Sequence, residues 1–117
     1  MILAVLDDLM FTSKIKTTAA QLGVTVGFAR SADAALAEMR KAAPALVILD
    51  LNNPRTEPLT IVARMKQDPA LAPVPTVGYA SHVQTDVIQA ARQAGVDDVM
   101  ARSAFTQHLA EILGGHR

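Results

Sequence analysis

The sequence predicts an α/β fold, a doubly wound parallel sheet of five strands between two layers of helices. Five short apolar segments alternate with segments in which apolar residues recur at helical spacing, and the connections are short. The runs at residues 2–6 and 46–49 have no polar face, which is typical of strands buried on both sides in a parallel sheet. The first runs directly into Asp7 and Asp8, and the second into Asp50. These acids are therefore expected at the sheet edge where ligands bind.

Length and composition narrow the class of protein. The chain has 117 residues, enough for one core, so we expect residues 1–117 to form a single domain. Half of the residues are apolar and none is cysteine, which excludes a disulfide scaffold and thiolate metal sites. The 11 basic residues balance 11 acidic ones, which gives no case for binding nucleic acid or a membrane surface. Without a membrane-spanning stretch or a leader, we expect a soluble cytoplasmic protein.

The first half of the chain alternates strand and helix. After the first strand, a helix is predicted up to Gly23, which stands in the position that a C-cap glycine prefers. Its apolar stripe is Phe11, Ile15, Ala19 and Leu22. Residues 24–29 alternate weakly and are predicted to be a strand, and Ser31 suits the N-cap of a second helix that Pro44 stops. One face of that helix consists of Ala32, Ala35, Leu36 and Met39.

The second half continues the same alternation. Pro58 suits the first turn of a third helix that ends near Gln67, and the proline-rich residues 68–75 are predicted to be a loop. The two remaining strands are predicted at residues 76–79 and 96–101. A fourth helix closes at Gly95, and Ser103 can cap the last one. The fourth helix carries Val83, Val87, Ala91 and Ala94, and the last carries Phe105, Leu109 and Ile112.

Two doubly wound folds fit this order of elements. One is a five-stranded sheet with the flavodoxin-like order 2-1-3-4-5, and the other is a fragment of a larger Rossmann sheet. In the first, Asp7, Asp8 and Asp50 converge in one crevice. Clustered carboxylates usually need a cation, and oxygen ligands without histidine or cysteine favour Mg²⁺. A carboxylate beside Mg²⁺ can attack a phosphoryl donor, whereas any one acid alone would also suit a turn or a helix N-cap.

These motifs give the chain an end-to-end resemblance to the receiver domain of two-component response regulators, the CheY-like receivers. Asp7 and Asp8 resemble the acidic pair of that family. Residues 50–54 (DLNNP) resemble its phosphoacceptor segment, and residues 94–98 (AGVDD) resemble the stretch before its last strand. The resemblance implies a three-layer flavodoxin-like fold with strand order 2-1-3-4-5.

The resemblance also implies a function in phosphorelay signal transduction. Asp50 would accept a phosphoryl group from a histidine kinase or a phosphotransfer protein, and a downstream protein partner would receive the signal. Asp8, Asp50 and the backbone carbonyl of Asn52 would hold Mg²⁺ or Mn²⁺, with Asp7 supporting through water. A homodimer would use the face of the fourth helix, fifth strand and fifth helix. The chain would be a signalling module and not an enzyme.

The second half of the chain departs from the family pattern. Ala80 stands where the family has a hydroxyl residue that contacts the phosphoryl group; Ser81 is a candidate substitute, although a shift of one residue turns a strand side chain to the opposite face. Arg102 replaces the usual lysine; it keeps the charge and could contact phosphate, but it is bulkier. Three further departures are Val99 for an aromatic residue, Ser103 for a proline, and Pro58 near a missing loop glycine. Without that proline, we expect a trans Arg102–Ser103 bond.

Several functions remain open at this level. The leading interpretation is an atypical single-domain response regulator, and the alternative is a pseudo-receiver that works as an interaction module without phosphorylation. The three acids favour the first, and the missing hydroxyl and aromatic residues favour the second. An aspartyl-phosphate phosphatase would need a second acid where Asn52 stands. A flavin site would need a phosphate loop where Asp7 and Asp8 would repel phosphate.

Overall fold

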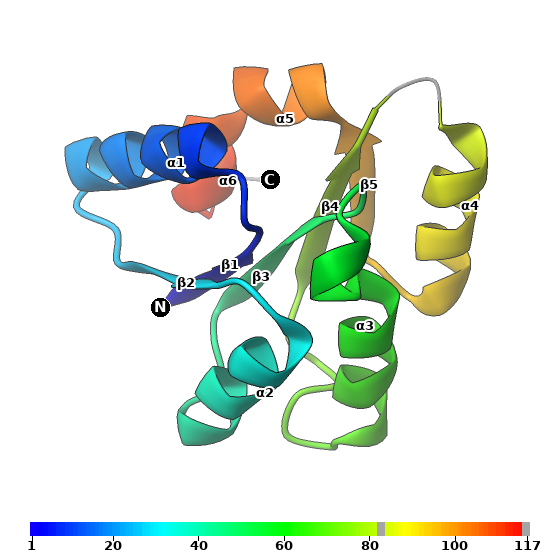
Figure 1. Cartoon of the computed structure of the whole chain (residues 1–117). Helices are drawn as coiled ribbons and strands as arrows, with labels where there is room; N and C mark the ends of the chain where they lie inside the picture. Colours follow the sequence, from blue (N-terminus) through cyan, green and yellow to red (C-terminus); the bar gives the residue numbers. More distant parts are fainter. Residues whose placement is uncertain (82–83, 116–117) are drawn as a thin grey trace.

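A five-stranded parallel sheet with the order β2-β1-β3-β4-β5 forms the centre of the protein (Figure 1). The structure is a computed structural model that describes residues 1–81 and 84–115. Its strands are β1 (Ile2–Val5), β2 (Val26–Ala29), β3 (Leu46–Asp50), β4 (Thr76–Ala80) and β5 (Asp98–Ala101). This order confirms the doubly wound fold and, of the two expected topologies, the flavodoxin-like one.

Helices cover both faces of the sheet and complete a three-layer arrangement (Figure 1). One face carries α1 (Leu9–Leu22), α5 (Arg102–Gln107) and α6 (Leu109–Leu113). The other carries α2 (Ala32–Lys41), α3 (Pro58–Gln67) and α4 (Thr85–Ala94), with a 3-10 turn, η1 (Pro54–Thr56), just before α3. None of the described helices is long and apolar enough to cross a membrane.

The sheet separates two apolar cores, because successive side chains of a strand point to opposite faces. In β3, Leu46 and Ile48 pack on the side of α1, α5 and α6, whereas Val47 and Leu49 pack on the side of α2, α3 and α4. Every residue of β1, β3 and β4 is buried, as the runs without a polar face predict. The same alternation turns Asp50, the last residue of β3, to the side of Ile48.

Four predicted helix ends are confirmed. Gly23 adopts the left-handed conformation after α1 at a φ of 69°, and Gly95 does the same after α4. The Ser31 hydroxyl accepts a hydrogen bond of 3.1 Å from the N–H of Ala34 and so caps α2. Pro58 is the first residue of α3, where a residue without an N–H loses no helical hydrogen bond.

The last helix differs from the prediction at its start and in its middle. It begins at Arg102, directly after β5, so Ser103 lies inside the first turn and cannot be the N-cap. Ala101 stands in the cap position, and no side chain caps the helix there, because the strand leads into the helix without a loop. A break at His108 separates α5 from α6. The predicted apolar stripe is nevertheless buried, at Phe105, Leu109 and Ile112.

The late start of β5 has a specific cause in the contact between Asp97 and Thr76. The Asp97 carboxylate accepts hydrogen bonds from the backbone N–H of Thr76 at 2.9 Å and from its hydroxyl at 3.2 Å. The Thr76 hydroxyl accepts in turn from the N–H of Asp97 at 2.9 Å. This exchange holds Asp97 in a turn, so the strand starts at Asp98 and not at residue 96.

Other element ends differ from the prediction by one or two residues. β2 begins at Val26, and β4 extends to Ala80, which lies opposite Ala101 of β5. Val83, expected on the fourth helix, lies outside the described residues, and α4 begins at Thr85.

Glu57 is the only non-glycine residue with a positive φ in the described part of the chain, at 49°. It connects η1 to α3 in the loop where the family resemblance leads one to expect a glycine. Its carbonyl accepts a hydrogen bond of 3.1 Å from the N–H of Ile61, which ties it to the first turn of α3. Because the left-handed region costs an ordinary residue about 1–2 kcal/mol, this loop is under strain.

Relief of that strain gives a prediction about stability. We expect Glu57→Gly to raise the free energy of unfolding by about 0.5–1 kcal/mol, because the strain removed exceeds the entropy that glycine adds to the unfolded chain. Urea denaturation measures the difference. Glu57→Ala keeps the Cβ and removes only the carboxylate, so it serves as the control and should give no comparable gain. A loss of stability in Glu57→Gly would show that the loop is not strained.

Candidate functional site

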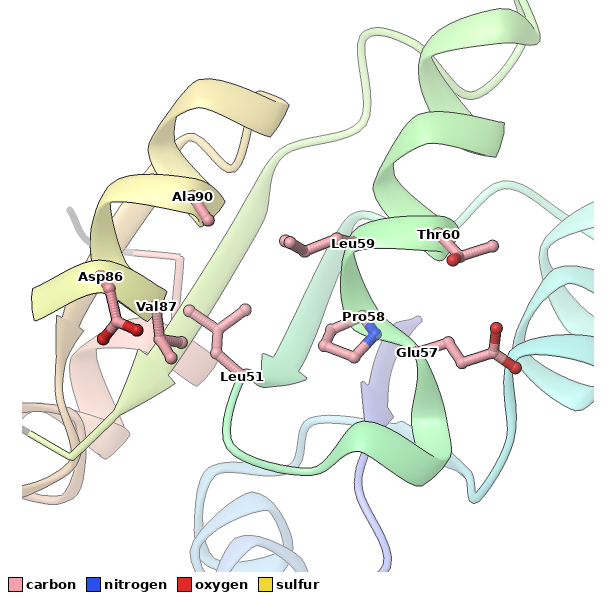
Figure 2. A pocket seen from close by; sticks show the side chains of 8 residues that line it. All are labelled: Leu51, Glu57, Pro58, Leu59, Thr60, Asp86, Val87 and Ala90. Atoms are coloured by element: carbon pink, nitrogen blue, oxygen red, sulfur yellow. The ribbon is translucent and has the colours of Figure 1, made fainter. Parts of the chain in front are cut away.

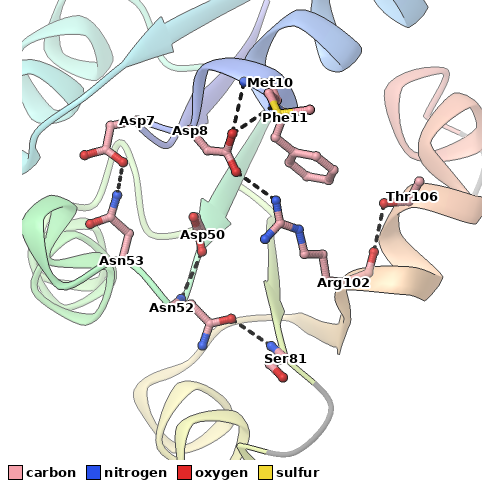
Figure 3. A network of polar contacts seen from close by, with 10 residues as sticks. All are labelled: Asp7, Asp8, Met10, Phe11, Asp50, Asn52, Asn53, Ser81, Arg102 and Thr106. Carbon is pink, nitrogen blue, oxygen red and sulfur yellow. Dashed lines mark hydrogen bonds and ion pairs between the residues drawn. The ribbon is translucent and has the colours of Figure 1, made fainter.

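The pairing of β1 with β3 brings the three predicted acids to one edge of the sheet. The two strands run parallel, with Val5 opposite Leu49. Asp7 and Asp8 follow β1, and Asp50 ends β3, so all three emerge at the carboxyl ends of neighbouring strands (Figure 3). In an open α/β sheet this is the edge at which ligands bind.

Asp8 has two roles, one for each of its oxygen atoms. Its Oδ1 accepts hydrogen bonds from the N–H groups of Met10 and Phe11 at 3.0 and 3.1 Å, so Asp8 is the N-cap of α1. Its Oδ2 accepts a charged hydrogen bond of 2.8 Å from Nη2 of Arg102. The pKa of Asp8 is therefore lowered, first by the N–H of Phe11 and then by the Arg102 guanidinium. Both oxygens are engaged by the protein itself.

Asp50 is the most deeply placed of the three acids, with 9% of its surface exposed. Its Oδ1 accepts a hydrogen bond of 3.0 Å from the N–H of Asn52, two residues along the turn. Burial raises its pKa, and the charges of Asp8 and Asp7 add to this, against the opposing effects of the Asn52 N–H and the Arg102 guanidinium. This carboxylate is thus held in a site where its negative charge is unfavourable.

Asp7 is turned toward the loop that follows β3. Its Oδ1 accepts a hydrogen bond from the side-chain amide of Asn53, and its Oδ2 lies 4.0 Å from Nη1 of Arg55. Within residues 1–81 and 84–115, no three histidine or acidic side chains lie close enough together to hold one metal ion. A cation at this edge would therefore depend on Asp8 and Asp50, completed by backbone or water oxygens.

Asn52 joins the turn after β3 to the region between β4 and α4. Its Oδ1 accepts a hydrogen bond of 2.7 Å from the backbone N–H of Ser81 (Figure 3). Its Nδ2 donates to the side-chain oxygen of Gln84. Ser81 therefore contributes its backbone to this network. The predicted role of its hydroxyl near Asp50 stays a prediction.

Small aliphatic residues stand where the family pattern has a hydroxyl and an aromatic ring. Ala80, the last residue of β4, is fully buried in the core beside α2, α3 and α4. Val99 of β5 is partly buried against the same core. Neither side chain can donate a hydrogen bond to an oxygen bound near Asp50.

Arg102 is held by a charged contact and by an aromatic surface. Its Cζ lies 4.7 Å from the centre of the Phe11 ring, while its Nη2 contacts Asp8. The Phe11 ring in turn belongs to a cluster of three aromatic rings whose centres lie 4.7 to 5.7 Å apart, formed with Tyr79 and Phe105. A planar guanidinium stacks on an aromatic face while its N–H groups bind a carboxylate, a geometry that suits arginine better than lysine. The bond that follows Arg102 is trans, as predicted, since no described peptide bond is cis.

Sequence reasoning missed three contributors to this edge: Phe11, Asn53 and Gln84. Asn53 could have been found, because its side-chain oxygen accepts from the N–H of Arg55 and caps η1, and asparagine before proline is a turn signal. Phe11 was predicted only as a core residue, and nothing in the neighbouring sequence indicates that Arg102 stacks on its ring. Gln84 has no sequence signal, since its partner Asn52 lies 32 residues away.

The fold and this edge define a class of protein, the doubly wound domain with acids at the switch point between β1 and β3. The model of the response regulator receiver domain matches residues 2–113. The chain therefore belongs to this family, the CheY-like receivers of two-component signalling. The search of curated proteins found no match.

Solved structures agree with this assignment. The receiver domain of NtrX from Brucella abortus is 25% identical, covers 99% of this chain and 97% of its own, and superposes with a TM-score of 0.80. The phosphorylated cyanobacterial phytochrome response regulator RcpA is 26% identical over 97% of this chain and 88% of its own, with a TM-score of 0.80. The Mn²⁺-bound form of response regulator Rcp1, at 23% identity, shares the fold with a TM-score of 0.75 over 97% of this chain and 88% of its own.

The residues at this edge fit a hard divalent cation. Asp8 follows β1 and Asp50 ends the neighbouring β3, and the pKa of Asp50 is raised first by burial and further by the charge of Asp8. The protein already places a cationic group, the Arg102 guanidinium, against Asp8. Mg²⁺ and Mn²⁺ prefer such oxygen ligands and keep several waters, so two carboxylates and a carbonyl suffice.

The raised pKa of Asp50 predicts how stability depends on pH. Because the folded state holds the Asp50 proton more tightly than the unfolded state, Asp50 makes the protein less stable as pH rises above its ordinary range near 3.8. Asp50→Asn should therefore be more stable than the wild type at neutral pH, and the gain should disappear in acid. Thermal unfolding at several pH values without divalent cations measures it. Asp33→Asn, which changes an exposed acid of α2, is the control; an equal gain there would contradict the assignment.

The contact between Arg102 and Asp8 predicts competition with a divalent cation. We expect Arg102→Gln to bind Mn²⁺ more tightly, by up to about fivefold, since a partly exposed ion pair contributes about 0.2–1 kcal/mol. Calorimetric titration of Mn²⁺ measures this. Arg55→Gln removes the more distant arginine beside Asp7 and should change the affinity less. Weaker Mn²⁺ binding by Arg102→Gln would show that the arginine does not compete for Asp8.

Proposed function

We propose that this receiver accepts a phosphoryl group on Asp50 and passes or displays it in a two-component relay. The donor would be a phosphohistidine of a histidine kinase or of a phosphotransfer protein. The phosphorus–nitrogen bond of the donor breaks while a bond forms between phosphorus and a carboxylate oxygen of Asp50. In this role the chain is a signalling protein and not an enzyme. The cytoplasmic location expected from the sequence stays a prediction.

The observation that supports the proposal is the position of Asp50, which lies close enough to Asp8 and Arg102 for both charges to affect its pKa. A buried carboxylate at the end of a central strand, with its pKa raised, is unfavourable unless a cation or a reaction makes use of it. The Asn52 N–H holds one oxygen of Asp50 and so orients the carboxylate. The second oxygen has no hydrogen bond from a described residue and can serve as the attacking atom.

Asp8, Asp50 and the carbonyl of Asn52 would hold Mg²⁺ or Mn²⁺ in this proposal, with Asp7 supporting through water. The ion would neutralise charge on the phosphoryl oxygens. Support comes from the Rcp1 structure, which contains Mn²⁺, and from RcpA, which is phosphorylated. If Asp8 held the cation, the Arg102 guanidinium would be free to contact the phosphoryl group, which its planar fork suits.

The receiver is proposed to be atypical in how it transmits the signal. Without a hydroxyl at Ala80 or a ring at Val99, a phosphoryl group lacks two contacts that could differ between the states of the switch. Ser81 would have to supply the missing hydroxyl, or Arg102 would have to carry the effect alone. The downstream partner, or a second copy in a homodimer, would bind the face formed by α4, β5 and α5.

A second candidate function is a pseudo-receiver, an interaction module that works without phosphorylation. The contact between Arg102 and Asp8 favours it, because the protein supplies its own cation at the proposed metal site. The aliphatic residues Ala80 and Val99 also favour a pseudo-receiver, because neither side chain can bind a phosphoryl oxygen. The two functions differ in whether Asp50 reacts.

Intact-mass measurement after incubation with Mg²⁺ and acetyl phosphate or phosphoramidate tests the proposal. The wild type should gain the mass of one phosphoryl group, because Asp50 offers an oriented, activated carboxylate beside a cation. Asp50→Asn should gain none, whereas Asp33→Asn should react like the wild type. No mass gain in the wild type with either donor would instead identify a pseudo-receiver.

A further inference from the structure

An apolar groove lies between α3 and α4, next to the turn after β3 (Figure 2). Its volume is about 390 Å³, and its apolar lining consists of Leu51, Pro58, Leu59, Val87 and Ala90. In Figure 2 these side chains lie in the space between the two helices, with Leu51 at the base of the groove. Leu59 is 38% exposed, which is high for a leucine on a helix that packs against a core. The proposed phosphoacceptor function does not use this surface.

The shape of the groove is fixed by the residues around it. A Cβ at position 78 would lie 2.7 Å from Cδ1 of Leu51, so only a glycine in β4 leaves room for Leu51 where it stands. Leu51 itself is 7% exposed and packs in the core beside α2, α3 and α4. On the other side, Pro58 begins α3 directly after the left-handed Glu57. A groove that is already formed before a partner arrives binds it at a lower entropic cost.

Two acidic residues also border the groove, with Asp86 at its α4 side and the Glu57 side chain extending outward beside Pro58 (Figure 2). Glu57 precedes α3, and Asp86 lies in the first turn of α4 (Figure 2). Both residues are exposed, and neither forms an ion pair with any described residue. The neighbouring sheet edge adds the three acids of the phosphoacceptor site. A ligand for this groove must therefore combine apolar surface with positive charge.

We propose that the groove docks a segment of a partner protein that presents one large apolar side chain flanked by lysine or arginine. The apolar side chain would fill the space above Leu51, between Leu59 and Ala90. The basic residues would pair with Glu57 and Asp86 on either side. The volume suits one or two side chains and lies at the lower end of the range for small-molecule sites, which favours a peptide anchor.

The groove is connected to the phosphoacceptor edge but does not depend on it. Leu51 directly follows Asp50, and the Asn52 side chain bonds to Gln84 at the start of α4. The groove is present in the unphosphorylated protein, so docking needs no reaction at Asp50. A failure of docking and a failure of phosphorylation are therefore separate results.

Three matched peptides test the proposal on the unphosphorylated protein. The first is an alanine- and glutamine-based helical peptide with one leucine flanked by lysines three and four positions away. The second replaces the leucine with serine, and the third replaces the lysines with glutamates. Amide chemical shifts in ¹⁵N-labelled protein report the site and the affinity.

Only the first peptide is expected to bind, and it should shift the amides of Leu51, Leu59, Val87 and Ala90. Glu57→Gln and Asp86→Asn should each weaken it about two- to fivefold, an effect that added salt should reduce. Ala90→Leu fills the groove and should abolish binding. If that variant does not fold, Leu59→Gln at the exposed wall should weaken binding instead. Asp33→Asn on α2 should bind like the wild type.

Several results would overturn the proposal. If the glutamate peptide bound as tightly as the lysine peptide, charge would not determine binding. If the amide shifts lay on another face, the groove would not be the binding site. No shift at millimolar concentrations of the first peptide would also reject it. Concentration-dependent self-association that Ala90→Leu abolishes would identify a second copy of the chain as the occupant.

Discussion

The parallel pairing of β1 with β3 is the constraint on which the rest of the site depends. Both strands are buried on both faces, so their register is fixed by the two cores and not by the acids. The pairing forces Asp8 and Asp50 to the same edge, whether or not their charges favour it. The pKa of Asp50 is raised, first because the carboxyl group is buried and then because Asp8 and Asp7 lie near it. The Asn52 N–H and the Arg102 guanidinium both oppose the rise in the pKa of Asp50, so they stabilise the carboxylate at this edge.

One guanidinium provides much of the compensating charge. Arg102 contacts Asp8, lowers its pKa and opposes the rise in the pKa of Asp50. It reaches this position because β5 leads into α5 without a loop and because Phe11 gives it a flat surface to rest on. The ring of Phe11 in turn packs on Tyr79 and the α5 core. The arginine is therefore built into the packing between α1 and α5, which a flexible lysine would not be.

The side of the site toward α4 is organised by an asparagine. Asn52 bonds to the backbone of Ser81 and to Gln84, so the turn after β3 and the start of α4 are joined directly. Leu51, the residue between Asp50 and Asn52, points away from this network into the groove between α3 and α4. Leu51 therefore connects Asp50 to the groove between α3 and α4, and Asn52 connects it to the start of α4. Ala80, at the end of β4, has no hydroxyl that could add a second polar contact on this side.

The sequence by itself determined the class of fold, because apolar runs and helical stripes are local patterns that depend only on neighbouring residues. It also located Asp50 and predicted the cap at Ser31. Element ends that depend on distant contacts, such as the start of β5 beside the contact between Asp97 and Thr76, were not predictable. Only the tertiary structure decided that Arg102 contacts Asp8, 94 residues earlier in the chain, and that Asn52 meets Gln84. Such pairs form where separate elements are brought within hydrogen-bond distance by packing, and no local pattern encodes that distance.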